Sequence, residues 1–262
     1  MKLNEGRHAF ITGGASGIGL GIAQSMSRRG MAVTIADINE DALAQVCASE
    51  PSLSGVVLDT RDREAWQRVK QQAEAARGPV DILVNNAGIA PNGRGFADMD
   101  PESFDRILAI NLVGIVNGVF AFAADMRERG RGHIVNTSSQ AGLTASIPGV
   151  GAYAVAKFGV TALSESLRME MEPHGVGVSV LCPGYVQTNL AQNTVRAGGD
   201  IRQYTAAMPE SSVTPAQVGE MVCEGIEADR LYILTHPDVW PSVAQRSEAI
   251  RADCAVREIA SA

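Results

Sequence analysis

The 262-residue sequence predicts an α/β fold in which a mostly parallel, seven-stranded sheet is covered by helices on both faces. Two observations support this prediction. Seven short apolar runs of β-type residues alternate with longer stretches of helical pattern. The short runs are almost continuously apolar, which is typical of parallel strands buried on both faces. We therefore expect a doubly wound domain of the Rossmann type.

The expected strands are, in order, residues 8–11, 32–36, 55–58, 81–84, 133–137, 177–181 and 231–234. Helix-length patterns between them include residues 17–29, 62–76, 101–129 and 152–172. No linker rich in proline or serine interrupts the alternation, so residues 1–262 are expected to form a single domain. Residues 189–212 are polar and longer than an ordinary connection, and we expect them to form a lid over the substrate.

Composition limits the classes of function. A net charge of -7 without a basic stripe argues against nucleic-acid binding. We find no apolar run of about 18 residues and no apolar core of a signal peptide, so we expect no membrane span and a cytoplasmic location. The four cysteines and four histidines lack the spacing of metal ligands, so we expect no metal.

A glycine-rich loop follows the first expected strand and opens a helix. Gly13 permits a tight turn, and Gly17 removes a side chain where a pyrophosphate would approach the helix N-terminus. Gly19 would let the helix pack closely on the strand, and Ser16 and Ile18 complete the loop. The alternative is a plain turn, but the strand before the loop and the helix after it favour a phosphate cradle.

Asp37 ends the second expected strand, about 20 residues beyond the loop, where a carboxylate can accept hydrogen bonds from adenosine ribose hydroxyls. A 2′-phosphate there would meet this negative charge, and the neighbouring Ser16, Ile38 and Asn39 offer no cation. The pattern predicts NAD rather than NADP. The alternative is that Asp37 merely caps the next helix.

Tyr153 and Lys157 are four residues apart on an expected helix and so share one face. The Lys157 ammonium would stabilise the Tyr153 phenolate, which could then exchange protons near neutral pH. A serine hydroxyl beside it would hold an alcohol or carbonyl oxygen in place for proton transfer. The pair is a candidate proton-transfer centre.

Taken in order, these motifs resemble the short-chain dehydrogenase/reductase family. The motifs that support the resemblance are residues 12–19, Asp59, residues 85–88, Asn111 in residues 111–114, Ser139, Tyr153 with Lys157, and residues 183–188. They run in family order through about the first three-quarters of the chain.

The resemblance implies four catalytic residues. Tyr153 would be the general acid/base, and Lys157 would lower its pKa while contacting the nicotinamide ribose. Ser139 would orient the substrate oxygen, and Asn111 would anchor a water connecting Lys157 to solvent. Ser139 is chosen over Ser138 because the family places the catalytic hydroxyl three residues before a glycine.

The resemblance also implies the binding residues. Asp59 would lie beside the adenine ring, and Thr188 with the backbone of Val186 would meet the carboxamide. The predicted cofactor-binding residues are Gly13, Ser16, Gly17, Ile18, Gly19, Asp37, Asp59, Asn85, Ala87, Gly88, Tyr153, Lys157, Pro183, Gly184, Val186 and Thr188. The predicted substrate-binding residues are Ser139, Gln140, Tyr153, Tyr185, Tyr204 and Met208.

The expected function is an NAD-dependent oxidoreductase that transfers a hydride between a secondary alcohol or ketone and the nicotinamide. One alternative is a carbonyl or 3-oxoacyl reductase using NADH or NADPH, which Asp37 and the lack of a basic patch for an acidic carrier disfavour. Another is a dinucleotide sensor without catalysis, which retention of the tyrosine and lysine disfavours. The apolar residues of 101–129, including Ile115, Val116, Val119, Phe120 and Phe122, exceed what one sheet face covers, and the resemblance suggests a homodimer or homotetramer.

Overall fold

The computed structural model describes residues 1–4, 6–201 and 213–255 and contains a seven-stranded sheet in which every neighbouring pair is parallel. The strand order is β3-β2-β1-β4-β5-β6-β7, so the chain reverses direction across the sheet between β1 and β4. The strands are β1 (His8–Thr12), β2 (Ala32–Asp37), β3 (Leu53–Val57), β4 (Ile82–Asn85), β5 (Gly132–Thr137), β6 (Val176–Cys182) and β7 (Tyr232–Leu234). The predicted fold class is confirmed, and the sheet is wholly rather than mostly parallel.

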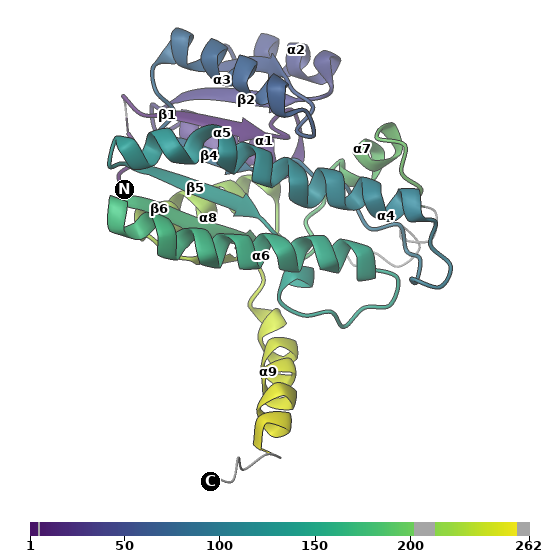
Figure 1. Cartoon of the computed structure of the whole chain (residues 1–262). Helices are drawn as coiled ribbons and strands as arrows, with labels where there is room; N and C mark the ends of the chain where they lie inside the picture. The colour runs from purple at the N-terminus through teal and green to yellow at the C-terminus, as the bar shows by residue number, and fades with distance from the viewer. Residues whose placement is uncertain (5, 202–212, 256–262) are drawn as a thin grey trace.

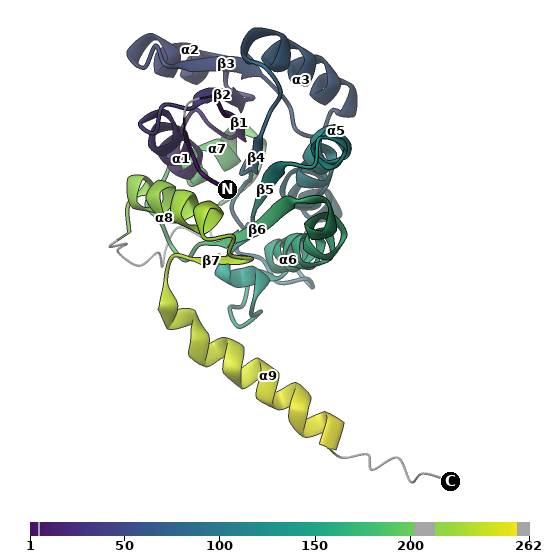
Figure 2. The same cartoon turned by 90° about the vertical axis from the view of Figure 1, so that its left-hand side faces the viewer.

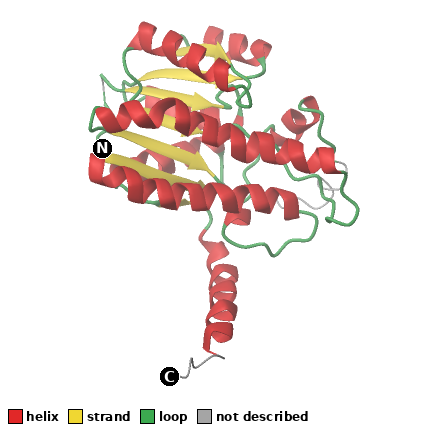
Figure 3. Cartoon of the chain, in the orientation of Figure 1, coloured by secondary structure: helices red, strands yellow, loops and turns green. Residues whose placement is uncertain are grey.

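Helices cover both faces of the sheet, as Figures 2 and 3 show. The helices are α1 (Gly17–Ser27), α2 (Glu40–Ser49), α3 (Arg63–Arg77), α4 (Pro101–Leu108), α5 (Gly114–Glu128), α6 (Gly151–Met171), α7 (Leu190–Arg196), α8 (Pro215–Glu227) and α9 (Trp240–Ala255). One apolar core joins α1, α2 and α8 to the sheet, and a second joins α3, α5 and α6 to its other face. Because both faces are covered, the central strands β1 and β4 are buried along their whole length.

Capping residues fix where several helices begin. The Asp62 carboxylate accepts hydrogen bonds from the first N–H groups of α3, and Asp100 does the same for α4, where Pro101 occupies the first turn. Thr214 and Gln217 form a reciprocal capping box at the start of α8.

The expected helix at 101–129 is interrupted. A π-helical turn, η1 (Ala109–Val113), separates α4 from α5. Contrary to our expectation, Pro101–Glu128 contains an 18-residue window of mean hydropathy 2.2, long and apolar enough by composition to cross a membrane. Half of that window is buried in the domain, and core helices pass the same test, so we describe it as a core helix.

Two segments lie outside the layered body. Of the expected lid at 189–212, the structure describes residues 189–201, which include α7; Tyr204 and Met208 lie outside the described residues. Helix α9 extends away from the sheet, and its Trp240 is 67% exposed (Figures 1 and 2).

Candidate active site

The candidate site lies at the carboxyl ends of the central strands, where the chain reverses its strand order. One cavity there, which we name the tyrosine cavity, is lined by Ser139, Tyr153, Lys157 and residues of the glycine loop. A second, the aspartate cavity, is lined by residues that include Asp37 and Asp59. Both are bordered by Gly13, Ala87, Gly88, Ile89 and Asn193, so they form one continuous cleft.

The glycine loop needs its glycines for two different reasons. Gly13 and Gly17 have φ of 64° and 54° and line the tyrosine cavity, where a Cβ would approach Ala87 Cα and Thr188 Cβ, each to 3.0 Å. Gly19 lines neither cavity, because it packs inside the loop, where a Cβ would lie 2.2 Å from the Gly13 oxygen. The close approach that Gly19 allows is therefore to its own loop.

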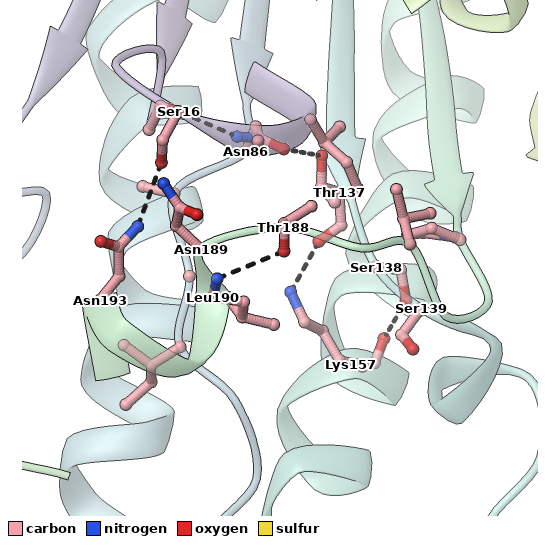
Figure 4. Close-up of a pocket in the computed structure, with 18 of the residues that line it drawn as sticks. Ser16, Asn86, Thr137, Ser138, Ser139, Lys157, Thr188, Asn189, Leu190 and Asn193 are labelled. Carbon is pink, nitrogen blue, oxygen red and sulfur yellow. Dashed lines mark hydrogen bonds between the residues drawn. The ribbon is translucent and has the colours of Figure 1, made fainter. Parts of the chain in front are cut away.

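Helix α6 brings Tyr153 and Lys157 together at the tyrosine cavity. Lys157 Nζ lies 5.4 Å from the centre of the Tyr153 ring and donates a hydrogen bond to the Thr137 oxygen at 2.8 Å (Figure 4). Lys157 is 3% exposed, and this burial lowers the pKa of its ammonium to about 8. The geometry is that of a positive charge held beneath a phenol.

The adjacent serines have different surroundings. Ser138 is buried and its Oγ donates a hydrogen bond to the Lys157 main-chain oxygen at 2.8 Å, so it joins β5 to α6. Both serines border the tyrosine cavity, but Ser139 is only half-buried, and its Oγ accepts a hydrogen bond from the Ala141 N–H at 3.1 Å. Ser139 is therefore the better placed of the two to meet a substrate.

Asn111 lies behind the cavity rather than on its wall. The side chain is fully buried in the π turn, where Oδ1 accepts from Ile89 N–H at 2.7 Å and Nδ2 donates to the Ile89 oxygen at 2.9 Å. A Cβ placed on Gly88 would lie 2.9 Å from Asn111 Oδ1 and 3.7 Å from Lys157 Nζ. Asn111 and Lys157 thus converge on the same glycine.

The residues after β4 divide between two sides of the sheet. Asn85 Nδ2 donates to Asn136 Oδ1, and Asn85 lines neither cavity. Asn86 lines the tyrosine cavity, receives a hydrogen bond from Thr137 Oγ1, and donates from its main chain and side chain to Thr12. The predicted binding residues do not include Asn86, although the motif at residues 85–88 contains it. Alternation along a strand could have identified it, because consecutive side chains point to opposite faces.

At the far end of the cleft, the Asp37 carboxylate accepts hydrogen bonds from the N–H groups of Ala15 and Asn39 at 3.2 and 3.0 Å. Asp59 lines the same cavity and pairs with Arg61 at 2.5 Å, which lowers the pKa of the Asp59 carboxyl. Arg196 of α7 also lines this cavity. Our expectation of no nearby cation considered only sequence neighbours, and the fold adds two arginines.

The remaining predicted residues separate into two groups. Ser16, Ile18, Ala87, Gly88, Pro183, Gly184, Val186 and Thr188 line the tyrosine cavity. Gln140 instead donates from Nε2 to the His236 oxygen and to Asp238, and lines a different cavity beside the loop at residues 144–147. Tyr185 lines neither cavity of the cleft. Ile89, Thr137, Ser138, Asn189, Leu190 and Asn193 also line the tyrosine cavity.

The structure places none of the cysteines and histidines in a cluster with the geometry of a metal site within the described residues. Residues 1–4, 6–201 and 213–255 hold no group of three His, Cys, Asp or Glu side chains able to bind a metal ion. His8 and His133 are buried and hydrogen-bonded to Thr34 and Ser179.

Comparison with known proteins agrees with this geometry. A family model described as short chain dehydrogenase matches residues 7–198. The probable oxidoreductase EphD of Mycobacterium tuberculosis is 41% identical over 189 residues, a match that covers 70% of this chain and 32% of EphD. The chain thus spans about a third of the length of that relative.

Two further proteins match over nearly the whole chain. A C alpha-dehydrogenase of a Sphingobium species is 31% identical over 266 residues, which cover 95% of this chain and 87% of that protein. The structure of a short chain dehydrogenase/reductase from Burkholderia phymatum in complex with NAD has a TM-score of 0.86 at 30% identity and covers 97% of each chain.

Proposed function

The chain belongs to the short-chain dehydrogenase family, a family of oxidoreductases, and from that membership we propose that it transfers hydride between a secondary alcohol or ketone and NAD. The observation that carries the proposal is the tyrosine cavity. Tyr153, Lys157 and Ser139 line it together with the positive-φ glycines of a phosphate-type loop. Proton-transfer groups and a dinucleotide cradle therefore border the same space.

Four side chains of this protein would have different roles in this reaction. The Tyr153 phenol would exchange the proton of the substrate oxygen, with the Lys157 ammonium stabilising its phenolate. The Ser139 hydroxyl would hold the same oxygen. Asn111, which is hydrogen-bonded to both main-chain groups of Ile89, would hold the Ile89 backbone in position beside Lys157. When bound, NAD supplies the hydride acceptor.

The residues present fit a nicotinamide dinucleotide. A side chain at Gly13 or Gly17 would fill the space beside Ala87 and Thr188. Glycine leaves that space open for a pyrophosphate. Asp37 supports NAD over NADP because its carboxylate faces the aspartate cavity, where a 2′-phosphate would be repelled. Two arginines line this cavity: Arg61 is paired with Asp59, and we assign Arg196 to the diphosphate rather than to the ribose. The NAD complex of the Burkholderia phymatum relative also supports this choice.

The substrate we propose is an organic secondary alcohol with apolar bulk. Two observations support it: the apolar Val186 and Leu190 on the wall of the tyrosine cavity, and the name of the Sphingobium relative, C alpha-dehydrogenase. We also propose that residues 1–262 act as one domain and assemble as a homodimer or homotetramer. Exposed apolar side chains on the outer helix layer support the assembly: Phe120 is 65% and Met169 78% exposed.

The test is a panel of secondary alcohols assayed with NAD and with NADP by nicotinamide absorbance. We expect turnover with NAD on at least one apolar alcohol and slower turnover with NADP. Faster turnover with NADP on every substrate would contradict the assigned role of Asp37.

Replacement of Tyr153 by Phe removes the proton-exchanging oxygen and keeps the ring. Turnover is expected to fall at least about a hundredfold, because a positioned acid/base contributes this much or more. Calorimetric binding of NAD should persist in the variant. Near-wild-type turnover would rule out the mechanism.

A further inference from the structure

The proposed function leaves helix α7 without a role beyond that of a substrate lid. Its position points elsewhere. Leu190 and Asn193 line the tyrosine cavity, while Asn193, Arg196 and the following Ala197 line the aspartate cavity. One short helix therefore runs along both parts of the cleft.

We propose, on the premise that the cleft binds a dinucleotide, that α7 is a clamp on the cofactor and that Arg196 binds its diphosphate. The clamp would secure the adenosine half of the cofactor, whereas the expected lid was to cover the substrate.

Hydrogen bonds hold α7 against the cleft. Asn193 Nδ2 donates to Ser16 Oγ in the glycine loop at 3.2 Å, a contact visible in Figure 4. Thr194, which is 2% exposed, accepts a hydrogen bond at Oγ1 from the Ala90 N–H at 2.8 Å. The first contact spans the cleft from α7 to the start of α1, and the second ties the helix to the segment after β4.

Position along the helix places Arg196 near the diphosphate. Gly13 and Asn193 border both cavities, so the middle of a bound dinucleotide would lie between them. Arg196 follows Asn193 by three residues, which is about 4.5 Å along the axis and nearly the same face of the helix. An arginine side chain is long enough to cover that displacement and to bind two phosphate oxygens at once.

Charge supports the same assignment. Within the described residues, Arg196 has no carboxylate partner and is exposed. The other cations of the cleft are engaged: Arg61 with Asp59, and Lys157 with the Thr137 oxygen. Arg196 therefore remains to offset a diphosphate in a cleft that also contains the carboxylates of Asp37 and Asp59.

The experiment measures calorimetric affinities of the purified protein for ADP and for adenosine, so catalysis plays no part in the readout. We expect Arg196→Gln to weaken ADP binding about tenfold, as the loss of one solvent-exposed charge-assisted contact would. Adenosine binding should stay within about twofold. Arg196→Lys should recover only part of the affinity for ADP, because lysine keeps the positive charge but cannot bind two phosphate oxygens at once.

Arg127→Gln is the matched control. Arg127 is exposed and occupies the last turn of α5, as Arg196 does in α7, but it lines neither cavity. Its replacement removes the same net charge and the same favourable helix-end charge, and ADP affinity should not change.

The outcomes separate the clamp from the proposed function. Unchanged ADP affinity in Arg196→Gln, or equal weakening of ADP and adenosine, would overturn the clamp and leave the proposed function standing. A wild-type protein that binds neither ADP nor NAD would overturn the proposed function and the clamp with it.

Discussion

Gly142 lies where the Ser139 segment crosses α6, against two buried oxygen atoms. A Cβ at this position would lie 2.2 Å from Ser138 Oγ and 2.6 Å from the main-chain oxygen of Lys157. Backbone cannot move aside cheaply, so the absence of a side chain sets the separation between Ser139 and Tyr153.

We expect Gly142→Ala to lower the free energy of unfolding by about 1–3 kcal/mol, as overpacking of a buried site does. Turnover should fall by about tenfold or more, because small displacements of reacting groups are costly. Thermal unfolding and the alcohol assay measure the two effects. Gly95→Ala is the control, since nothing lies within 4 Å of a Cβ there. Equal behaviour of the two variants would contradict the positioning role.

Asn85 and Asn86 are neighbours in one motif, but their side chains point in different directions. The resemblance identified residues 85–88 as bordering the cofactor, but a motif does not say which side chain faces which side of a sheet. Asn85 faces Gly118 of α5, where a Cβ would lie 2.1 Å from Asn85 Oδ1, and Asn86 faces the cleft. The direction of each side chain follows from the strand, not from the motif.

At the scale of elements, β5 joins the site to a buried histidine at its other end. His133 Nε2 lies 2.8 Å from Ser179 Oγ on β6, and Ser179 Oγ donates to the Arg230 oxygen at 2.6 Å, so Nε2 is the donor. Burial lowers the pKa of His133 to about 4, since the charged ring would lose its hydration.

This pKa predicts how stability depends on pH. Between pH 6.5 and 4 the unfolded chain binds a proton at His133 and the folded protein does not, so stability falls as the pH falls. The loss attributable to His133 is about 3 kcal/mol and is complete only below pH 4. Above pH 6.5 the histidine contributes no slope.

Urea unfolding at several pH values from 7 to 4 measures the effect. His133→Gln cannot take the proton and should flatten the curve, with the pH dependence from the buried His8 remaining. Carboxyls whose pKa is lowered in the folded protein, such as Asp229 and Glu220, also make stability fall below about pH 5, so the His133 contribution is taken as the difference between wild type and variant at each pH. An unchanged slope in the variant would contradict the assignment.

The interrupted helix at 101–128 is a second case at this scale. Periodicity predicts one continuous helix, because a π turn adds a single residue and barely disturbs the apolar pattern. The structure places Asn111 in that turn, where its amide bonds both main-chain groups of Ile89. A partner 22 residues earlier in the chain determines this local geometry, and periodicity does not record it.

At the scale of the molecule, the outer helix layer separates buried from exposed apolar residues. Ile115, Val119 and Phe122 of α5 are 2%, 6% and 1% exposed and belong within the monomer, whereas Phe120 is 65% exposed. Val155 and Met169 on α6 are 46% and 78% exposed. Some of the apolar residues that exceed one sheet face in the sequence are therefore buried in the core, and the others are exposed at the surface.

We expect light scattering at micromolar concentration to show a dimer or tetramer for the wild-type protein. Phe120→Glu should shift it toward the monomer, because a carboxylate would lose its hydration in a packed interface. Phe120→Leu keeps an apolar side chain and should preserve the assembly. A monomeric wild-type protein would remove the expectation.

The sequence alone determined the order of elements and named the candidate catalytic residues. All seven strands were predicted to within two residues at either end, because strands buried on both faces must be apolar and must end at turn-forming residues. The ordered motifs named Tyr153, Lys157 and Ser139, which line one cavity. These patterns can be recognised in the sequence without knowledge of the tertiary structure.

Only the tertiary structure decided which distant side chains share the cleft. Arg61 and Arg196 line the same cavity as Asp37. Asn86 lines the tyrosine cavity, whereas Gln140 lines a different cavity. Helix α7 lies along both cavities of the cleft. Some of these contacts join residues more than a hundred positions apart, as the bond from Asn193 to Ser16 does. The physical reason is that their energies depend on distances in space, which the spacing of residues along a chain does not encode.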